Sequence, residues 1–362
     1  MEHYQQVMGL NVELGVTVGK INYDDSSRQY TVPIKSQDGN ERVVTTRHLV
    51  LATALISSEP LRPEFENESS FTGQIYHSVS HKSARLIPDL AQKKVAIIGA
   101  GTSAFDIAQD FVNFGAKEVT IIQRSPLFVV SLEAQENFVL AGWKMMPMND
   151  ADLVSSSFPL PIALTLLVGA TYAMAQHDAE LLSGLERAGL SVKRGEDGIG
   201  ILHHQLLKAG HFYIEQGAGQ MIVDGKIKVK RCQEGVKGFD PNAVILADST
   251  RIEADIVVVA TGFKPFSVVA QQIMGGEFMA KAGLVGELDE EMERIAVSFQ
   301  LPWFLSFLLI ILAFQWWRSS GVPGFWYMTG SFLWSRCFSK TLALQIKAAE
   351  EGLNGDYYLD SK

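Results

Sequence analysis

Lys94 to Arg124 reads KVAIIGAGTSAFDIAQDFVNFGAKEVTIIQR, and this stretch decides the fold of the chain. An apolar run, Val95 to Ile98, predicts a buried strand that leads into a glycine-rich segment. A helical pattern follows, with Phe105, Ala108 and Phe111 on one face, and Val119 to Ile122 predicts the next strand. Strand, glycine-rich turn, helix and strand in this order are typical of a βαβ unit that binds a dinucleotide.

The glycine-rich segment has the residue types that a pyrophosphate requires. Gly99 allows the tight turn, Gly101 lets the backbone approach the phosphates, and Ala104 packs the helix on the strand. The first helical residues, Thr102 and Ser103, offer free backbone N–H groups. We predict that these five residues bind the cofactor; the alternative is a βαβ unit that binds no phosphate.

The end of the second predicted strand bears on the choice of cofactor. A site for NAD has Asp or Glu there, which holds the ribose 2′-hydroxyl. This chain has Gln123, Arg124 and Ser125 instead. An arginine with neighbouring hydroxyl groups suits a 2′-phosphate, so we predict NADP, with Arg124 and Ser125 as binding residues.

The composition limits the class of protein. With 362 residues, 47% of them hydrophobic, the chain can form two or three domains with sizeable cores. A net charge of −9 and the lack of a basic run argue against a nucleic-acid partner. The two cysteines, Cys232 and Cys337, form no disulfide framework, and the eight histidines show no metal-binding spacing. We therefore expect no metal site. Since the first residues also lack a secretory pattern, we expect a cytoplasmic protein.

Two stretches of the chain resemble each other. Residues 30–54 and 243–262 each contain a strand, a polar turn, a second strand and an apolar strand that ends in Ala-Thr-Gly or a variant of it. The turn at residues 37–40 is a hairpin signal. The predicted dinucleotide unit lies between the two stretches. We therefore expect an α/β protein in which one nucleotide-binding domain is inserted into another; the alternative is a chance likeness of two β-meanders.

Two apolar segments raise the question of a membrane. Leu153 to Gln176 carries no charge, but Pro159 and Pro161 interrupt it, so we expect a buried or surface-docked helix. No charge occurs between Arg294 and Arg318 either, and residues 301–317 are long and apolar enough to be a transmembrane candidate.

Several further motifs resemble those of flavin-containing monooxygenases that use both FAD and NADPH. The family's identifying element, FxGxxxHxxx(Y/F), fits Phe71 to His81 except at its last position, where His81 replaces an aromatic residue. Gly99 to Ala104 is similar to the family's second fingerprint, GxGxSA. The other similar elements are Asp255 to Gly262, Gly321 to Tyr327 and Ser339 to Ile346.

The resemblance implies a fold, two cofactors and a reaction. It implies an NADPH-binding Rossmann domain at 91–235, inserted into an FAD-binding domain formed by 1–90 and 236–362. NADPH would reduce the flavin, and one oxygen atom of O2 would pass to a nitrogen, a sulfur or a carbonyl-bearing small molecule. His77 would lie near the linker to the NADPH domain, or serve only the structure, and Thr261 and Gly262 would lie along the flavin or the linker. The resemblance assigns no catalytic residue and no oligomeric state.

The largest departure from the family concerns FAD. Family members begin with an FAD fingerprint, but residues 1–70 contain no Gly-x-Gly, and Ala54 replaces a glycine. We therefore expect that the chain begins inside an incomplete FAD-binding domain and that its affinity for FAD is low. One alternative is an NADP-binding protein without oxygenase chemistry. Another is a membrane-anchored flavin reductase, associated with an intracellular membrane through residues 301–314.

The apolar segment 297–315 has a further interpretation. Val297-Ser298 can be encoded by GTG-AGT and Gln315 by CAG, which resemble the two ends of an intron. Removing residues 297–315 joins Ala296 to Trp316 in frame, close to the family's continuous sequence. We hypothesise a translated intron; a membrane segment and a core helix are the alternatives.

Overall fold

The computed structural model describes residues 2–53, 56–158, 160–206, 210–282, 317, 320, 322–328 and 330–353. The chain divides into two compact units. Unit 1 comprises residues 1–57, 265–290 and 294–362, and unit 2 comprises residues 58–264 with 291–293. The chain passes between them through β6 (Ile56–Pro60) and β18 (Phe263–Pro265), which pair with each other.

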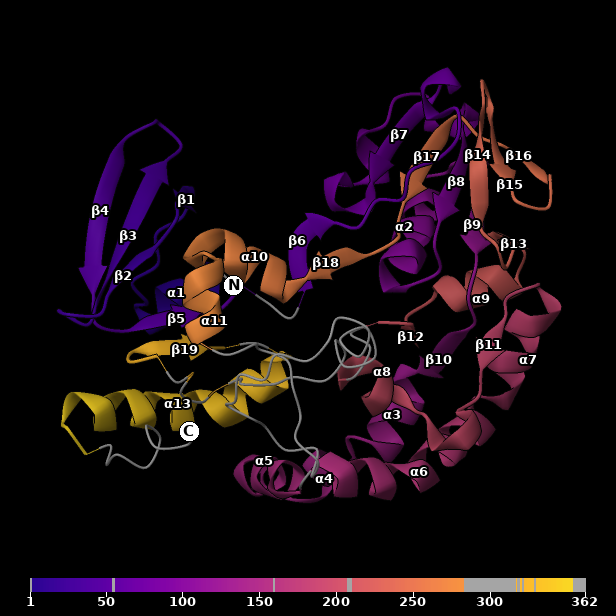
Figure 1. Ribbon diagram of the computed structural model, residues 1–362. Coiled ribbons are helices and arrows are strands. Elements are labelled where there is room, and N and C mark those ends of the chain that lie inside the picture. The colour runs from indigo at the N-terminus through magenta and orange to yellow at the C-terminus, as the bar shows by residue number, and fades with distance from the viewer. Residues whose placement is uncertain are drawn as a thin grey trace. The chain divides into compact units, whose positions relative to one another are not determined.

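Unit 2 is built on a parallel sheet of five strands (Figure 1). Its order is β13 (Lys228–Arg231), β9 (Glu118–Gln123), β8 (Lys94–Ile98), β17 (Ile256–Val259) and β7 (Gln74–His77). Val95 of β8 lies opposite Val119 on one side and Ile256 on the other. Continuous apolar runs suit these central strands because both faces of the sheet are buried.

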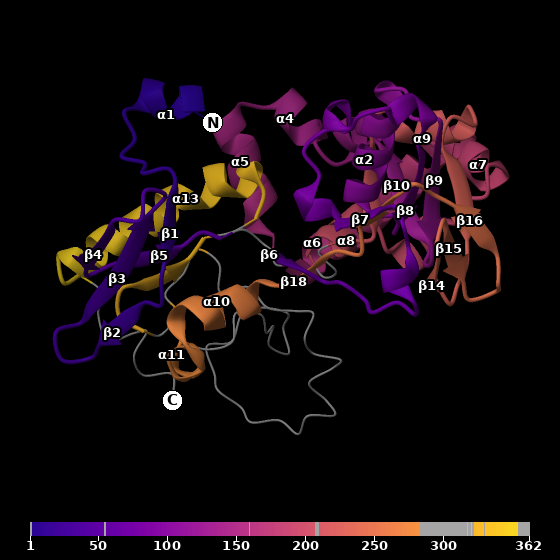
Figure 2. The same cartoon turned by 90° about the horizontal axis from the view of Figure 1, so that it is seen from above.

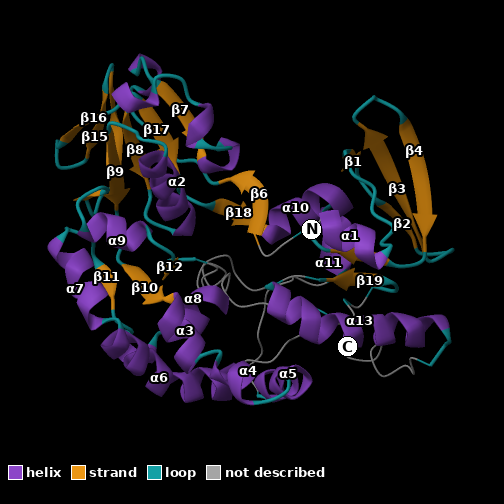
Figure 3. Ribbon diagram, turned by 180° about the vertical axis from the view of Figure 1, so that it is seen from behind, coloured by secondary structure: helices purple, strands orange, loops and turns teal. Residues whose placement is uncertain are grey.

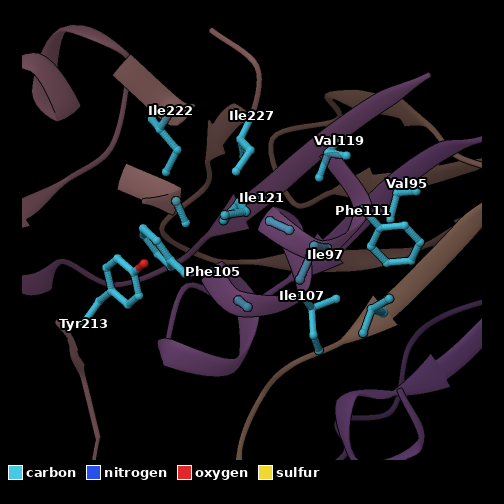
Figure 4. Close-up of a cluster of buried hydrophobic side chains, with 14 of the residues drawn as sticks. Val95, Ile97, Phe105, Ile107, Phe111, Val119, Ile121, Tyr213, Ile222 and Ile227 are labelled. Atoms are coloured by element: carbon cyan, nitrogen blue, oxygen red, sulfur yellow. The ribbon is translucent and has the colours of Figure 1, made fainter. Parts of the chain in front are cut away.

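Alternate side chains of each strand enter different cores. Val95 and Ile97 pack with α2 (Thr102–Asn113), α7 (Ala179–Arg187) and α9 (Ala218–Val223), as Figure 4 shows for α2. Ala96 and Ile98 face a second core. This core is covered by the antiparallel meander of β14 (Val236–Asp240), β15 (Ala243–Leu246) and β16 (Arg251–Glu253). Each fully buried large aliphatic side chain contributes about 1.5–3 kcal/mol.

A smaller parallel sheet completes unit 2. Its order is β11 (Val192–Lys193), β10 (Leu127–Ser131) and β12 (Phe212–Glu215). The segments that connect its strands contain α3 (Leu132–Phe138), α4 (Ala141–Met145), α5 (Met148–Ser157), α6 (Leu160–His177) and α8 (Ile201–Leu206), which Figure 3 shows in purple. Short 3-10 turns occupy Glu68–Ser70, Ser78–Ser80, Ala84–Leu86, Leu90–Gln92 and Glu196–Gly198.

The charge-free segment 153–176 forms the end of α5 and most of α6. Leu164 and Met174 of α6 are buried, whereas Leu166 and Tyr172 are exposed, so the helix is docked along one face, as expected. Within the described part of the chain, no single helix is long and apolar enough to cross a membrane. Among the helices that the structure describes, α5 and α6 together reach that length and composition, and they are bent by 111°.

Unit 1 combines a β-meander with a pair of parallel strands. In the meander, β3 (Gln29–Ser36) pairs antiparallel with β1 (Val16–Val18), β2 (Asn22–Asp24) and β4 (Glu41–Thr46). β5 (Leu49–Leu51) pairs parallel with β19 (Phe325–Tyr327). Among the described residues of this unit, the helices are α1 (Glu2–Met8), α10 (Phe266–Met274), α11 (Gly276–Lys281) and α13 (Phe332–Glu350), which Figure 2 shows from above. The core is aromatic, and the buried Tyr30 hydroxyl donates to the Pro323 carbonyl at 2.7 Å.

The predicted likeness of residues 30–54 and 243–262 is confirmed in outline. In each unit an antiparallel hairpin, β3–β4 or β15–β16, leads into an apolar strand that pairs in parallel, β5 or β17. The structure is the expected α/β type. The two compact units do not correspond to the predicted FAD-binding and NADPH-binding domains, whose bounds at residues 90 and 235 stay a prediction. The segments 297–315 and 301–317, for which we hypothesised a translated intron or a membrane segment, lie outside the described residues except for Trp317. Ala54 also lies outside them.

Candidate dinucleotide-binding site

The site begins where β8 ends, at Gly99. This residue has a φ of +120°, and a Cβ on it would lie 2.3 Å from the carbonyl oxygen of Ala260. Its own N–H donates to the carbonyl of Ile122 at 3.0 Å. Only glycine satisfies both the positive φ and the close approach, so the predicted tight turn is present and is required by the protein's own packing.

Gly101 is different, because the protein leaves space beside it. Its φ of −87° and ψ of −180° suit any residue, and a Cβ on it would meet nothing within 4 Å. No side chain caps α2. Among the described residues, the backbone N–H groups of Gly101, Thr102 and Ser103 have no acceptor. They are the free donors of a helix N-terminus, where the helix dipole also favours an anion.

The side chains of the first helical turn have separate tasks. The Thr102 hydroxyl donates to the Phe212 carbonyl of β12 at 3.0 Å, so it anchors the helix to the smaller sheet. Ser103 is exposed. Ala104 is completely buried and packs in the core between α2 and the sheet, as predicted. An anion at this helix end would meet backbone N–H groups and the exposed Ser103.

Arg124 and Ser125 follow β9 and are both exposed. The preceding Gln123 is completely buried; its side chain donates to the Ser191 carbonyl at 2.8 Å and accepts from the Ser191 N–H at 2.7 Å. This pair of hydrogen bonds fixes the end of β9. In the described part of the chain, Arg124 forms no ion pair or hydrogen bond. Its charge is therefore available at the carboxyl end of the sheet.

His77 lies at the end of β7 and is 5% exposed. Its Nδ1 accepts from the N–H of Val79 at 3.2 Å, so the proton of the neutral ring is on Nε2, which donates to the carbonyl of Gly262 at 3.1 Å. Burial lowers the pKa of His77, which favours this neutral form. Both ring nitrogens thus contact the backbone, and the predicted cofactor contact stays a prediction.

Thr261 and Gly262 follow β17 and lie beside the segment near Leu61. The Thr261 hydroxyl donates to the Leu61 carbonyl at 2.6 Å, and the Leu61 N–H donates to Gly262 at 3.0 Å. Gly262 has a φ of +95°. The structure therefore brings His77, Thr261 and Gly262 together. Because β17 pairs with β8, it also places Ala260 directly against Gly99.

One polar cluster near this site has no signal in the local sequence pattern. The Nε2 of His81 lies 2.9 Å from a carboxylate oxygen of Asp110 on α2, and its Nδ1 lies 3.0 Å from the hydroxyl of Tyr76. The Asp110 carboxylate also accepts from the Ala84 N–H, so it is covered in part. His81 stacks on Tyr76, with an angle of 4° between the rings, and so occupies an aromatic position of the motif.

No group of three or more His, Cys, Asp or Glu side chains that could hold a metal ion occurs in the part of the chain that the structure describes. Asp106, also on α2, is exposed, and its pKa is raised by partial desolvation. These residues do not form an evident acid–base centre.

Comparison with known proteins relates the chain to monooxygenases. Residues 3–140 match the L-lysine 6-monooxygenase/L-ornithine 5-monooxygenase family. The chain is 29% identical to the probable indole-3-pyruvate monooxygenase YUCCA8 of Arabidopsis thaliana, over 78% of this chain and 60% of the relative. It is 24% identical to the FAD-containing monooxygenase EthA of Mycolicibacterium smegmatis, over 75% of this chain and 53% of the relative. The chain thus spans between half and two thirds of the length of these relatives.

The fold is similar to that of a solved structure. The open crystal structure of cyclohexanone monooxygenase matches with a TM-score of 0.55 and 14% identity, and the match covers 97% of this chain and 70% of that one. The architecture is thus that of proteins with two dinucleotide-binding domains. By sequence the chain is thus similar to flavin-dependent monooxygenases, and its fold is similar to that of cyclohexanone monooxygenase.

Proposed function

We propose that unit 2 binds NADPH at the N-terminus of α2, as the hydride donor of a flavin-dependent monooxygenase. The carrying observation is the open helix end: three backbone N–H groups without an acceptor among the described residues, next to a Gly101 that has free space. Charge-assisted hydrogen bonds contribute about 1.5–3 kcal/mol each. A pyrophosphate that accepts two or three of them would be held firmly.

The adenosine end supports NADP over NAD. At the end of β9 the chain has the exposed Arg124 and Ser125, where an NAD site has a carboxylate. A guanidinium binds a phosphate through two parallel hydrogen bonds, and a serine hydroxyl can add a third. The 2′-phosphate of NADP is therefore the group that this end of the sheet suits.

FAD is the second proposed cofactor, and it would accept the hydride and react with O2. The chain's own residues fit it less well than they fit NADP. Residues 1–70 contain no Gly-x-Gly, so the arrangement that Gly99 and Gly101 provide in unit 2 has no counterpart there. The proposed substrate is a small molecule with an oxidisable nitrogen, sulfur or carbonyl group. A second candidate function, NADP binding without oxygen chemistry, is favoured by the same observation.

Binding of both cofactors tests the proposal. Calorimetric titration of the purified chain should give tighter binding of NADP+ than of NAD+, and Arg124→Gln should remove most of the difference. Equal affinity for both nucleotides in the unmodified chain would overturn the NADP assignment. The visible spectrum after incubation with FAD and gel filtration then separates the two functions. A retained flavin spectrum that NADPH bleaches supports the monooxygenase, and a colourless protein that binds NADPH supports the binding protein.

A further inference from the structure

A second arginine ends the strand next to Arg124. β13 pairs parallel with β9, and Arg231, the last residue of β13, lies opposite Gln123. The N–H of Cys232 then donates to the Gln123 carbonyl at 3.0 Å, which holds the two strand ends together. Since neighbouring strands are about 4.8 Å apart, the two strands end next to each other at the carboxyl edge of the sheet, with Arg124 one residue beyond the pair of Gln123 and Arg231.

The alternation of side chains distinguishes Arg231 from its neighbour. Val229 packs against the core formed by α2, α7 and α9, and its partner in β9 is Ile121 of the same core. Side chains two residues apart lie on the same face of a strand. Arg231 is therefore on the face covered by α2, whose N-terminus is the proposed pyrophosphate site. Lys230 is on the opposite face, one residue further from the edge, and Arg124, beyond the end of β9, approaches the edge from that opposite face.

Two cations at the other end of the sheet are paired. Lys228, at the start of β13, forms an ion pair with Glu118 at 2.6 Å, and Lys94, at the start of β8, forms one with Glu253 at 2.7 Å. Arg231 and Arg124 are exposed, and neither has an ion pair or hydrogen bond among the residues that the structure describes. Arg231 and Arg124 thus add uncompensated positive charge at the end where the cofactor is proposed to bind.

One acidic residue lies nearby and must be considered. Glu234 is exposed in the turn closed by the Gly235 N–H, which donates to Cys232 at 3.0 Å. Among the described residues, Glu234 forms no ion pair with Arg124 or with Arg231. On the other side of the turn, a Cβ on Gly235 would lie 3.5 Å from Cδ of Arg124, so the turn packs against the stem of that arginine.

We propose that Arg231 is a second cation of the 2′-phosphate site and contributes to the choice of NADP over NAD. A phosphate monoester carries a charge of about −1.5 to −2 at pH 7, so one guanidinium neutralises it only in part. Arg124 and Arg231, on adjacent strand ends, together supply the matching charge. This inference rests on the proposed function, because it adds a residue to the same site.

The test compares Arg231→Gln with Lys230→Gln in the full chain. Both variants remove one exposed cation from the same strand, but on opposite faces. The dissociation constants of NADP+ and NAD+ are measured for each by calorimetry at two salt concentrations. We expect Arg231→Gln to weaken NADP+ binding about tenfold, as the loss of a charge-assisted hydrogen bond does, and to leave NAD+ unchanged. Lys230→Gln should change either constant less than about twofold, as an exposed charge does.

The outcomes separate this inference from the proposed function. If the unmodified chain prefers NADP+ and Arg124→Gln removes the preference, but Arg231→Gln does not alter it, the role of Arg231 is overturned and the NADP site stands. If the unmodified chain does not distinguish the nucleotides, the NADP site itself is overturned. If Lys230→Gln loses as much NADP+ affinity as Arg231→Gln, the positive charge of the strand attracts the nucleotide without a specific contact, and the role of Arg231 is overturned. Arg231→Lys should retain part of the preference.

Discussion

Gly99 lies against the carbonyl oxygen of Ala260, so close that a Cβ on Gly99 would stand 2.3 Å from it. The contact joins the ends of β8 and β17, where the Ala260 N–H also donates to the Ile98 carbonyl at 2.8 Å. The first glycine of the fingerprint therefore serves the protein's own packing. Gly101, two residues later, has no such contact. The two glycines should respond to the same substitution in opposite ways.

Gly99→Ala should unfold or strongly destabilise the protein. The added methyl group meets a backbone oxygen that cannot move without breaking the pairing of β8 and β17, and the φ of +120° adds strain. We expect a loss of more than about 3 kcal/mol, measured by urea denaturation. Gly115→Ala is the matched control: its φ is +82°, but a Cβ there meets nothing within 4 Å, so it reports strain alone, about 1 kcal/mol. Equal losses in both variants would contradict the packing argument.

Gly101→Ala should fold normally and bind NADP poorly. Its backbone angles suit alanine and the space beside it is open, so the stability should change by less than about 0.5 kcal/mol. The methyl group would occupy the place where a pyrophosphate approaches the backbone, and we expect NADP+ affinity to fall at least about tenfold. Thermal unfolding with and without NADP+ checks both parts. A variant that keeps its melting temperature and its nucleotide-induced shift would show that phosphate does not bind here.

The sequence predicted the βαβ unit closely because its signals are local. Each signal determines the backbone next to it: the apolar run of β8, the glycine-rich turn and the helical spacing of the apolar residues in α2. In that helix, Phe105, Ala108 and Phe111 are completely buried. The hairpin of β3 and β4 was predictable for the same reason.

Contacts between distant segments were not predictable in this way. The pair formed by His81 and Asp110 joins residues 29 positions apart, and nothing in the local pattern of α2 distinguishes Asp110 from the exposed Asp106. Likewise, the position of Arg231 beside Arg124 depends on the pairing of β13 with β9, whose members are far apart in the sequence. A polar residue on a helix gives no sign of whether a partner from another segment will cover it.

The coupling between His81 and Asp110 can be measured with a double-mutant cycle. His81→Phe keeps an aromatic ring on Tyr76 and removes the hydrogen bond to Asp110, and Asp110→Asn removes the charge. We expect a coupling free energy of about 0.5–3 kcal/mol from urea denaturation of the four proteins. A cycle of Lys35→Gln and Glu41→Gln, an exposed pair, is the control and should give less than about 1 kcal/mol. Additive losses at His81 and Asp110 would show that the contact contributes nothing.

His77 should make the stability of the protein depend on pH. Burial lowers its pKa below the ordinary value of 6.5, so below pH 6.5 the unfolded chain binds a proton that the folded ring resists. The free energy of unfolding therefore falls as the pH drops through 6.5, until the folded ring also becomes protonated. Protonation is unfavourable in the fold because Nδ1 must accept from the Val79 N–H.

The variant His77→Asn isolates this contribution. At pH 7.5 it should be less stable than the unmodified chain by about 1–3 kcal/mol, because buried hydrogen-bonding groups at Val79 and Gly262 lose their partner. At pH 5.5 the difference should be smaller, since only the unmodified chain loses stability through this histidine. Urea denaturation at both pH values measures the difference directly. A difference that is constant or grows on acidification would mean that His77 is not held in its neutral form, and would remove the tautomer assigned to it from the description of the site.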